Sequence, residues 1–517
     1  MYGLKLSDVR DIFTRKCRRM AFECILQSHG LSEKHHSHIL QLRNEGIFKL
    51  EYLTLEQVMS SISKGQHEYS PLLQIPLFLY CSLVHRLISH GVCCPTVTLK
   101  LLQRPLTELN LSDNTNSSVI YSKPIFHRLR ELPLEKLVLD NCSSLTDASL
   151  MHLKVIKSLK VLSLSGCQSL TNDSFRHIKE LKNLKSLSVS RVGKVSTAGV
   201  AHLSDGDSSV LEILDLSYTS VEENSPHSNI FKTLQHHSRL HTLNISGATK
   251  LHHLYELRNL LSLRHLIASR NTLSKDAIEQ EIGKLTRLEY INLEGTDIKG
   301  GYQCLQYIFD LPLLAYCNLS IKVFETTHQS ISHHIESINL TTLSLANNLI
   351  VDDLMLAQLL KPLSRLLALD VSRTRVSSRC LKEELPRLAN LKVLGLQGLE
   401  LHDDDLVFLA KLSKIRKLNL NDTLLTDTFV TKNYLAGCSS LELLSLCRTH
   451  ISDRGLGSIM LNNLRTLWLD GCSVSVEVVL SLSVSKCKNL SYVSLRESKP
   501  IRNEEEILAA EVLDMLD

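Results

Sequence analysis

A pattern of apolar residues that recurs along most of the chain restricts what it can fold into. Each copy has apolar residues at relative positions 0, 3 and 5, and a small or hydrogen-bonding residue at position 8. Sixteen copies, on average roughly 26 residues apart, start at residues 106, 134, 159, 184, 211, 240, 263, 288, 314, 340, 366, 391, 415, 441, 464 and 490. Such a period predicts a solenoid, because one short unit cannot bury its own apolar face and must stack on its neighbours.

Each repeat has the pattern of a short strand followed by a helix. Positions 2 to 6 alternate outward and inward, which is typical of a strand with one buried face. In residues 144–158, Leu150, Leu153 and Ile156 recur at intervals of three, which favours a helix with one apolar stripe, and Asp147 is placed to cap it. Stacked repeats therefore predict an α/β solenoid, a curved arc with a parallel sheet on its concave face and helices on its convex face.

Position 8, just after each strand, is predicted to turn inward and to satisfy backbone groups that the turn buries. Asparagine or threonine is common there, and three repeats have Cys142, Cys167 and Cys472. We interpret these cysteines as small, buried, weakly polar residues that form no disulfide. Four repeats depart from the pattern, and irregular turns are expected in them. They are the repeats of Val192, Ala248, Lys322 and Leu399.

The segment from Cys142 to Leu150 has the form C-x-x-L-T-D-x-x-L. With it, the repeats of residues 101–500 resemble the cysteine-containing class of leucine-rich repeats, which many substrate receptors of cullin-type ubiquitin ligases carry. The resemblance implies a leucine-rich-repeat solenoid that works as a protein-protein interaction module. A ubiquitin-ligase substrate receptor is one function that it implies. A non-ligase scaffold or regulatory protein is the alternative, because one solenoid architecture serves many partners.

The two ends of the chain lack the repeat. Residues 1–100 have helical apolar patterns and are expected to form a helical cap, and residues 501–517 an acidic capping helix, because an open solenoid needs its terminal cores covered. The alternative for residues 1–100 is an adaptor-binding region. Pro76, Leu77 and Cys81 are similar to the helix with which some ubiquitin-ligase receptors bind elongin C, although His85 stands where an apolar residue is expected.

Charge and motifs argue against several other functions. The chain has 58 basic and 54 acidic residues, a formal net charge of +4, which is too balanced for a general nucleic-acid-binding protein. Its longest apolar run, residues 71–89, includes Gln74, Pro76 and Arg86 and predicts a buried helix rather than a membrane span. The N-terminus has no apolar segment before its first charges and is not a secretory signal, so a cytoplasmic or nuclear location is expected.

No motif in the chain predicts catalysis. The sequence contains no Walker motif and no H-E-x-x-H, C-x-x-C or G-x-S-x-G segment. The histidine-rich stretch 29–38, with Cys24 before it, matches no zinc pattern, and a solvated loop is the preferred interpretation. We therefore expect a protein that is not an enzyme and has no cofactor or metal site.

A protein or peptide partner is expected on the concave face, which positions 2, 4 and 6 of each strand should line. Six acidic and three basic residues at these positions predict a mildly acidic surface. The single tryptophan, Trp468, lies at position 4, with Asp470 two residues on and Tyr492 on the next strand. Aromatic residues often anchor interfaces, so Trp468, Asp470 and Tyr492 are predicted to bind a segment with an apolar residue and a lysine or arginine.

Two more acidic residues, Asp370 and Asp215, are predicted partner-binding positions of the same face. The rim at position 7 has a mixture of charges. These are Arg191, Arg270, Arg373 and Arg448 against Asp113, Asp422 and Glu497. The alternative interpretation is that these charges are scattered solvated side chains and that Trp468 is a surface residue with no binding role.

Overall fold

The structure, a computed structural model, describes residues 3–4, 102, 105–112, 123–204, 210–222, 229–299, 302–321 and 339–496. These residues belong to two compact units, the first within residues 51–314 and the second within residues 315–517 together with 1–50. Apart from Gly3 and Leu4, the predicted cap at 1–100 lies outside the described residues. So do the adaptor-binding candidates Pro76, Leu77 and Cys81 and the predicted helix at 501–517.

A strand of three residues occupies positions 2 to 4 of every predicted repeat. In the first unit these strands are β2 (Glu108–Asn110), β3 (Lys136–Val138), β4 (Val161–Ser163), β5 (Ser186–Ser188), β6 (Ile213–Asp215), β7 (Thr242–Asn244), β8 (His265–Ile267) and β10 (Tyr290–Asn292). In the second they are β12 (Tyr316–Asn318), β13 (Thr342–Ser344), β14 (Ala368–Asp370), β15 (Val393–Gly395), β16 (Lys417–Asn419), β17 (Leu443–Ser445), β18 (Thr466–Trp468) and β19 (Tyr492–Ser494).

Within each unit the successive strands pair in parallel and in register. Position 3 therefore faces position 3 of the next strand, as Leu137, Leu162 and Leu187 do along β3, β4 and β5. These side chains are buried, and those at positions 2 and 4 are on the opposite side of the sheet. Three short strands lie outside this series. They are β1 (Gly3–Leu4), antiparallel to β19, and the parallel pair β9 (Thr272–Ser274) and β11 (Asp297–Lys299).

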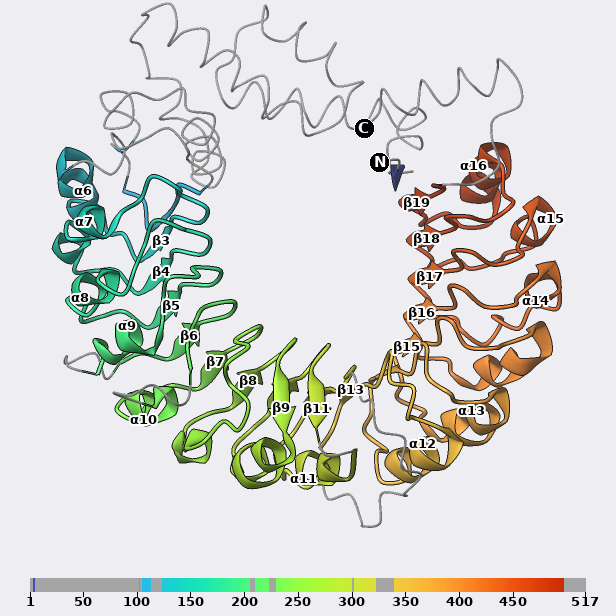
Figure 1. Ribbon diagram of the computed structural model, residues 1–517. Helices are drawn as coiled ribbons and strands as arrows, with labels where there is room; N and C mark the ends of the chain where they lie inside the picture. Colours follow the sequence, from blue (N-terminus) through green and yellow to red (C-terminus); the bar gives the residue numbers. More distant parts are fainter. Residues whose placement is uncertain are drawn as a thin grey trace, which may run out of the picture. The chain divides into compact units, whose positions relative to one another are not determined.

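Short helices follow the strands and form the outer layer of each unit (Figure 1). In the first unit they are α6 (Lys123–Arg130), α7 (Asp147–Leu150), α8 (Ser174–Ile178), α9 (Thr197–Ala201), α10 (Ile230–Leu234) and α11 (Gln306–Phe309). The 3-10 helices η3 (Leu153–Val155), η4 (Leu257–Asn259), η6 (Ile282–Lys284) and η7 (Tyr302–Leu305) and the π-helix η5 (Ala277–Glu281) complete this layer.

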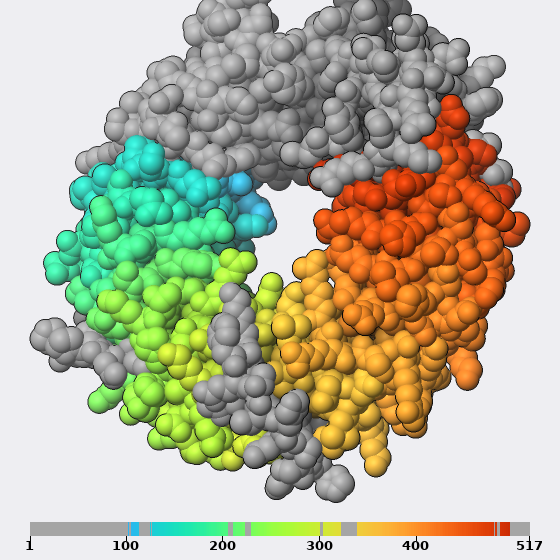
Figure 2. Space-filling view, turned by 45° about the vertical axis from the view of Figure 1, so that its right-hand side comes forward, coloured from blue at the N-terminus to red at the C-terminus, as the bar shows by residue number. Residues whose placement is uncertain are grey.

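The outer layer of the second unit has the same character. Its α-helices are α12 (Asp353–Leu360), α13 (Ser378–Glu384), α14 (Asp427–Thr431), α15 (Asp453–Leu456) and α16 (Val476–Ser485), and its 3-10 helices are η8 (Leu385–Arg387) and η9 (Asp403–Lys411). Figure 2 shows that repeats adjacent in the sequence lie side by side within each unit. This is the leucine-rich-repeat architecture that the sequence predicts. No helix of the described residues is long and apolar enough to cross a membrane.

The segment at 144–158 differs from the predicted single helix. It forms α7 and then η3, with a break between them. Leu150, Leu153 and Ile156 are nevertheless all buried. A spacing of three residues is the period of a 3-10 helix, so the same apolar pattern is satisfied by a tighter and shorter element.

Asp147 does not cap α7, which corrects the sequence prediction. Thr146 occupies the N-cap position and Asp147 is the first helical residue. The Asp147 carboxylate instead accepts hydrogen bonds from the backbone N–H and the hydroxyl of Thr171 in the next repeat, at 3.0 and 2.6 Å. The same link recurs in the second unit, at Asp353 with Ser377, Asp403 with Thr426 and Asp427 with Ser452. These carboxylates join each repeat to its neighbour.

The cysteines at position 8 have the predicted structural role. Each is buried, and its thiol donates to the carbonyl at position 5 of the preceding repeat. The S···O distances are 3.3 Å from Cys142 to Leu111, 2.9 Å from Cys167 to Leu139, and 3.0 Å from Cys472 to Leu446. All nine cysteines of the described residues are buried free thiols.

The turns of Val192, Ala248 and Leu399 are regular, contrary to the prediction. All three side chains are buried. The residue before each of them has the left-handed φ seen at position 7 of other repeats, 58° at Arg191, 65° at Gly247 and 68° at Gly398. The residue at position 7 sets the turn, so position 8 needs only a side chain that can be buried. Lys322 lies outside the described residues.

Removing a buried leucine should destabilise one neighbourhood of repeats. Leu162 and Leu467 are 1 % and 0 % exposed, so Leu162→Ala and Leu467→Ala should each cost about 2–5 kcal/mol. Hydrogen exchange should rise mainly in the adjacent repeats, because a solenoid couples nearest neighbours. Leu261→Ala, at a site 75 % exposed, is the control and should cost less than about 0.5 kcal/mol. A uniform loss of protection across the chain would contradict a solenoid.

The position-8 cysteines should react slowly in the native protein. The neighbouring Cys142 thiol and burial both raise the pKa of Cys167, and the thiolate is the reactive form. We expect Cys142, Cys167 and Cys472 to resist iodoacetamide under native conditions and to react fully in denaturant, as mass spectrometry of the labelled peptides would show. Rapid native labelling of all three would mean that the repeat register is wrong.

Candidate functional site

The aromatic pair predicted on the concave face forms in the second unit. Trp468 ends β18 and Tyr492 begins β19, and their ring centroids lie 5.3 Å apart with planes inclined by 49°. Both side chains are half-buried. They share the face opposite the buried Leu467 and Val493. We call this side of the sheet, with positions 2, 4 and 6 of the repeats and the turn at position 7, the strand face.

Asp470 lies on the strand face beside the aromatic pair. Its Oδ1 accepts hydrogen bonds from the Ser494 hydroxyl at 2.5 Å and from the backbone N–H of Arg496 at 2.7 Å. Both donors belong to the next repeat, so the carboxylate ties two neighbouring strands together. The structure thus brings Trp468, Asp470 and Tyr492 together, and it also gives Asp470 a structural role.

The other two predicted binding residues lie elsewhere. Asp370 ends β14, four strands before β18 in the sheet, and its Oδ1 accepts the backbone N–H of Ser372 at 2.9 Å. Asp215 ends β6 of the first unit, and its Oδ1 accepts the N–H and the hydroxyl of Ser217 at 3.0 and 2.7 Å. Both carboxylates brace the turn after their own strand, and neither lies with Trp468. A partner-binding role for them stays a prediction.

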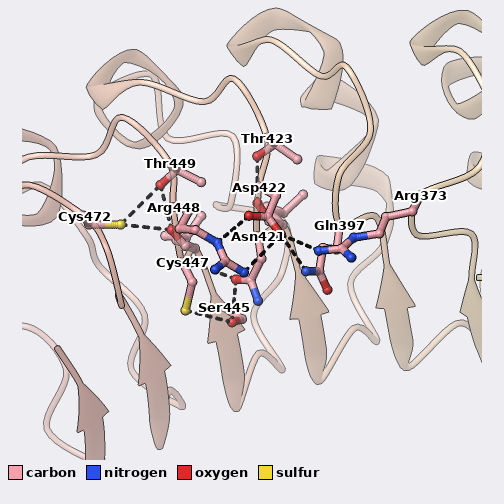
Figure 3. Close-up of polar contacts among 12 residues, drawn as sticks. Arg373, Gln397, Asn421, Asp422, Thr423, Ser445, Cys447, Arg448, Thr449 and Cys472 are labelled. Atoms are coloured by element: carbon pink, nitrogen blue, oxygen red, sulfur yellow. Dashed lines mark hydrogen bonds and ion pairs between the residues drawn. The ribbon is translucent and has the colours of Figure 1, made fainter. Parts of the chain in front are cut away.

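A cluster of rim residues that the sequence did not group together lies on the same face (Figure 3). Its centre is Asp422 at position 7. Arg373 Nη2 donates to Asp422 Oδ2 at 3.0 Å, and Gln397 Nε2 donates to the same oxygen at 2.7 Å. Arg448 Nε donates to Oδ1 at 2.6 Å. One carboxylate therefore gathers donors from three other repeats.

The turn geometry explains why these side chains converge. Arg373, Asp422 and Arg448 have φ values of 55°, 55° and 54°. Each side chain therefore leaves a left-handed backbone residue in the turn that follows its strand. Gly398, which lies between the repeats of Arg373 and Asp422, has a φ of 68° and also leaves room for the crossing side chain. A Cβ there would lie 2.8 Å from Arg373 Cγ. A glycine at this position lets Arg373 extend across one whole repeat.

The cluster keeps Asp422 charged and its arginines accessible. Partial burial pushes the pKa of Asp422 upward, but the hydrogen bonds from Gln397, Arg448 and Arg373 outweigh it, so the pKa lies below its ordinary value. The Asp422 side chain is 24 % exposed, against 51 % for Arg373 and 61 % for Arg448. Two arginines around one carboxylate give this cluster a net charge of +1.

The predicted acidity of the strand face belongs to one unit only. Positions 2, 4 and 6 of the first unit have Glu108, Asp140, Asp215 and Glu294 against Lys136. The same positions of the second unit have Asp370 and Asp470 against Lys417 and Arg496. The face that contains the aromatic pair is therefore balanced at these positions, and its rim has the arginine pair around Asp422. The excess of acidic residues expected on the inner face therefore comes from the first unit.

Comparison with known proteins adds likenesses of fold. No known family model matches the sequence, and no curated protein matches it. Among solved structures, an internalin of Listeria monocytogenes is similar at 20 % identity and a TM-score of 0.42, covering 72 % of this chain and 88 % of that one. A leucine-rich-repeat protein of Leptospira interrogans is similar at 19 % and 0.40, covering 82 % and 91 %. The functional domain of InlJ from Listeria monocytogenes gives 15 % and 0.40, covering 73 % and 70 %.

The sequence held a partial signal for the rim cluster. The arginines and Asp422 are visible at position 7, but nothing in the linear pattern says that Arg373 passes over Gly398 to a residue two repeats away. That contact depends on the left-handed turn and on the absence of a side chain at one intervening position. Among the described residues, no group of three or more metal-ligating side chains comes together.

The stabilising effect of Asp422 should depend on pH. Because its pKa is lowered in the folded state, its contribution is present above the ordinary carboxyl value of 3.8 and is lost as the pH falls through the folded value. Asp422→Asn should lower the free energy of unfolding by about 1–2 kcal/mol at pH 7, and this difference should shrink below a pH of about 4.

Urea unfolding of the wild type and Asp422→Asn at pH 7, 5 and 3.5 would test this. Asp173 pairs with Arg176 at 3.4 Å, but both side chains are more than 60 % exposed, so Asp173→Asn is a matched control that should change little at any pH. An Asp422→Asn deficit that stays constant down to pH 3.5 would show that the carboxylate charge is not what stabilises the rim.

Proposed function

We propose that this protein is a protein-binding module and that the strand face of its second unit is the binding surface. The observation that carries the proposal is the Trp468–Tyr492 pair, two half-buried aromatic rings on adjacent strands rather than in the core. Tryptophan and tyrosine are enriched where interfaces concentrate their binding energy. β17 pairs with β18 on one side, and β1 pairs with β19 on the other, so the rings lie on a continuous sheet and little conformational entropy is lost on binding.

A finer proposal is that the protein is a substrate receptor of a cullin-RING ubiquitin ligase, located in the cytoplasm or nucleus. Two features support it. The segment from Cys142 to Leu150 resembles the cysteine-containing repeats of such receptors and packs as that class requires, with Cys142, Leu145 and Leu150 buried. Pro76, Leu77 and Cys81 resemble an adaptor-binding helix. The alternative is a scaffold or regulatory protein that binds its partner in the same place without a ligase.

Affinity purification of the full chain from cells, followed by mass spectrometry, separates these alternatives. A receptor should recover a cullin and its adaptor, and a variant with Leu77→Ala and Cys81→Ala should lose both while keeping the other partners. Leu83→Ala, outside the motif in the same segment, is the matched control. If neither cullin nor adaptor is recovered under conditions that preserve such complexes, the ligase proposal is wrong and the scaffold alternative holds.

Trp468→Ala should weaken binding much more than folding. An anchor residue typically contributes roughly 2 kcal/mol or more to affinity. The loss of its contact with Tyr492 should cost about 1 kcal/mol of stability. Partner affinity and thermal unfolding of the purified variant would be compared with those of Met460→Ala, an exposed apolar residue outside the strand face. A destabilisation of several kcal/mol would place Trp468 in the core. A stable variant that still captures every partner would show that Trp468 is not an anchor.

A further inference from the structure

The charges around the aromatic pair indicate which chemistry its partner has. In the repeats of β14 to β19, positions 1, 2, 4, 6 and 7 have seven basic residues and five acidic ones. The basic residues are Arg373, Lys392, Arg416, Lys417, Arg448, Arg465 and Arg496. The acidic residues are Asp370, Asp422, Glu442, Asp470 and Glu497. These positions therefore have a net charge of +2, and five of the seven basic residues are arginines.

The described acidic residues of this face each have a partner within the protein. Asp370 and Asp470 accept backbone N–H groups through Oδ1, Asp422 accepts from two arginines and Gln397, and Glu442 lies 3.8 Å from Arg416. The guanidinium groups of Arg373 and Arg448, by contrast, are more than half exposed. An approaching segment therefore meets exposed guanidinium groups beside carboxylates that each have at least one partner within the protein.

Asp422 makes the two arginines a fixed feature of the surface. A free arginine side chain loses rotamer entropy when it binds an anion, but these two are already held from opposite sides of one carboxylate (Figure 3). Guanidinium groups match carboxylates in shape and can donate two parallel hydrogen bonds. The rim is thus prepared for carboxylates of a partner at a reduced entropic cost.

The rim and the aromatic pair are within reach of one short segment. The backbone N–H of Arg448 donates to the carbonyl of Asp470 at 2.8 Å, so the turn of Arg448 lies against the end of the strand that contains Trp468. Positions 4 and 7 are three residues apart, or about 10 Å if extended. An extended peptide of six residues spans about 20 Å, enough to place an apolar residue on Trp468 and Tyr492 and an acidic one at Arg448.

We propose that the strand face of β14 to β19 binds an acidic protein segment, with carboxylates at Arg373 and Arg448 and an apolar side chain on Trp468 and Tyr492. This rests on the proposed function of the same face and names the chemistry of its partner. It replaces the expectation of a basic partner, because the excess of acidic residues lies on the first unit. Binding should weaken as salt is added, since charge attraction brings the segment to the face.

The test is selection of a random 16-residue peptide library, displayed on phage, against the immobilised full chain. The enriched peptides would be synthesised with a fluorophore and their affinities measured by anisotropy in low and high salt. We expect peptides that combine aspartate or glutamate with an aromatic or aliphatic residue. Their affinity should fall at least about tenfold with the double change Arg373→Gln and Arg448→Gln, and replacing their acidic residues by lysine should abolish binding.

Three control variants make the result specific. Changing both residues to lysine keeps the charge but not the planar pair of donors, so it should recover only part of the affinity that the glutamine variant loses. Arg270→Gln removes the arginine at the same position 7 in the first unit, and Arg379→Gln removes an exposed arginine of α13. Neither of these should change binding. Circular dichroism would confirm that the glutamine variants are folded, as expected for side chains that are more than half exposed.

The outcomes separate this proposal from the proposed function. Enriched basic peptides, or acidic peptides that bind the double glutamine variant as well as the wild type, would overturn the acidic-segment proposal. If such peptides still lose binding with Trp468→Ala, the strand face remains the binding surface, and only the proposed acidic character of the partner is wrong. If neither Trp468→Ala nor the double glutamine variant changes the binding of any selected peptide, both proposals fail.

Discussion

The stacking of one repeat on the next is the interaction on which the rest of this structure depends. A single strand of three residues cannot pair its own backbone N–H and C=O groups, and it cannot bury its own apolar side chain. Each repeat therefore relies on its neighbour at three levels. Parallel pairing joins the strands, buried leucines such as Leu162 and Leu187 stack between them, and side chains such as Asp147 and Cys167 reach the backbone of the adjacent repeat. The described outer helices can remain as short as three to ten residues because these links, and not their own length, hold them in place.

The same stacking makes the turn after each strand a functional position. Position 7 has a left-handed backbone in each described repeat except that of Ile321. Glycine adopts this conformation without strain, and arginine, asparagine, aspartate and tyrosine adopt it in other repeats of this chain. Where the next repeat has glycine at this position, the absence of a Cβ leaves room for the long side chain before it. Gly398 beneath Arg373 and Gly471 beside Arg448 are the two cases on the rim of the second unit. Alternation of arginine and glycine along the rim therefore lets charges gather that are far apart in the sequence, as they do around Asp422.

Most of the fold could be predicted from the sequence, because the apolar pattern recurs in every repeat. The rim cluster could not, because the residues that form it come together only once. The apolar positions placed the strand of every repeat correctly, because the same spacing of apolar residues recurs in each copy. The helix expected at 144–158 is instead two short elements, because Leu150, Leu153 and Ile156 fit a 3-10 helix as well as an α-helix. Trp468 and Tyr492 could be paired from register alone. The meeting of Arg373 with Asp422 could not, because it depends on side-chain paths across Gly398 that no periodicity encodes.

The difference in charge between the two strand faces bears on function, because the fold does not require it. Positions 2, 4 and 6 are equivalent in every repeat, and serine or asparagine serves there in many copies. Where the fold needs an oxygen to brace the next turn, Asn419 does for Asn421 what Asp370 does for Ser372, so a carboxylate is not needed. The charge of the residues at these positions can therefore be determined by the chemistry of the binding partner and not by folding. Aromatic rings and the arginine pair around Asp422 in the second unit, with an excess of acidic residues at positions 2, 4 and 6 in the first, are the distribution expected if the two faces meet different chemistry on a partner or partners.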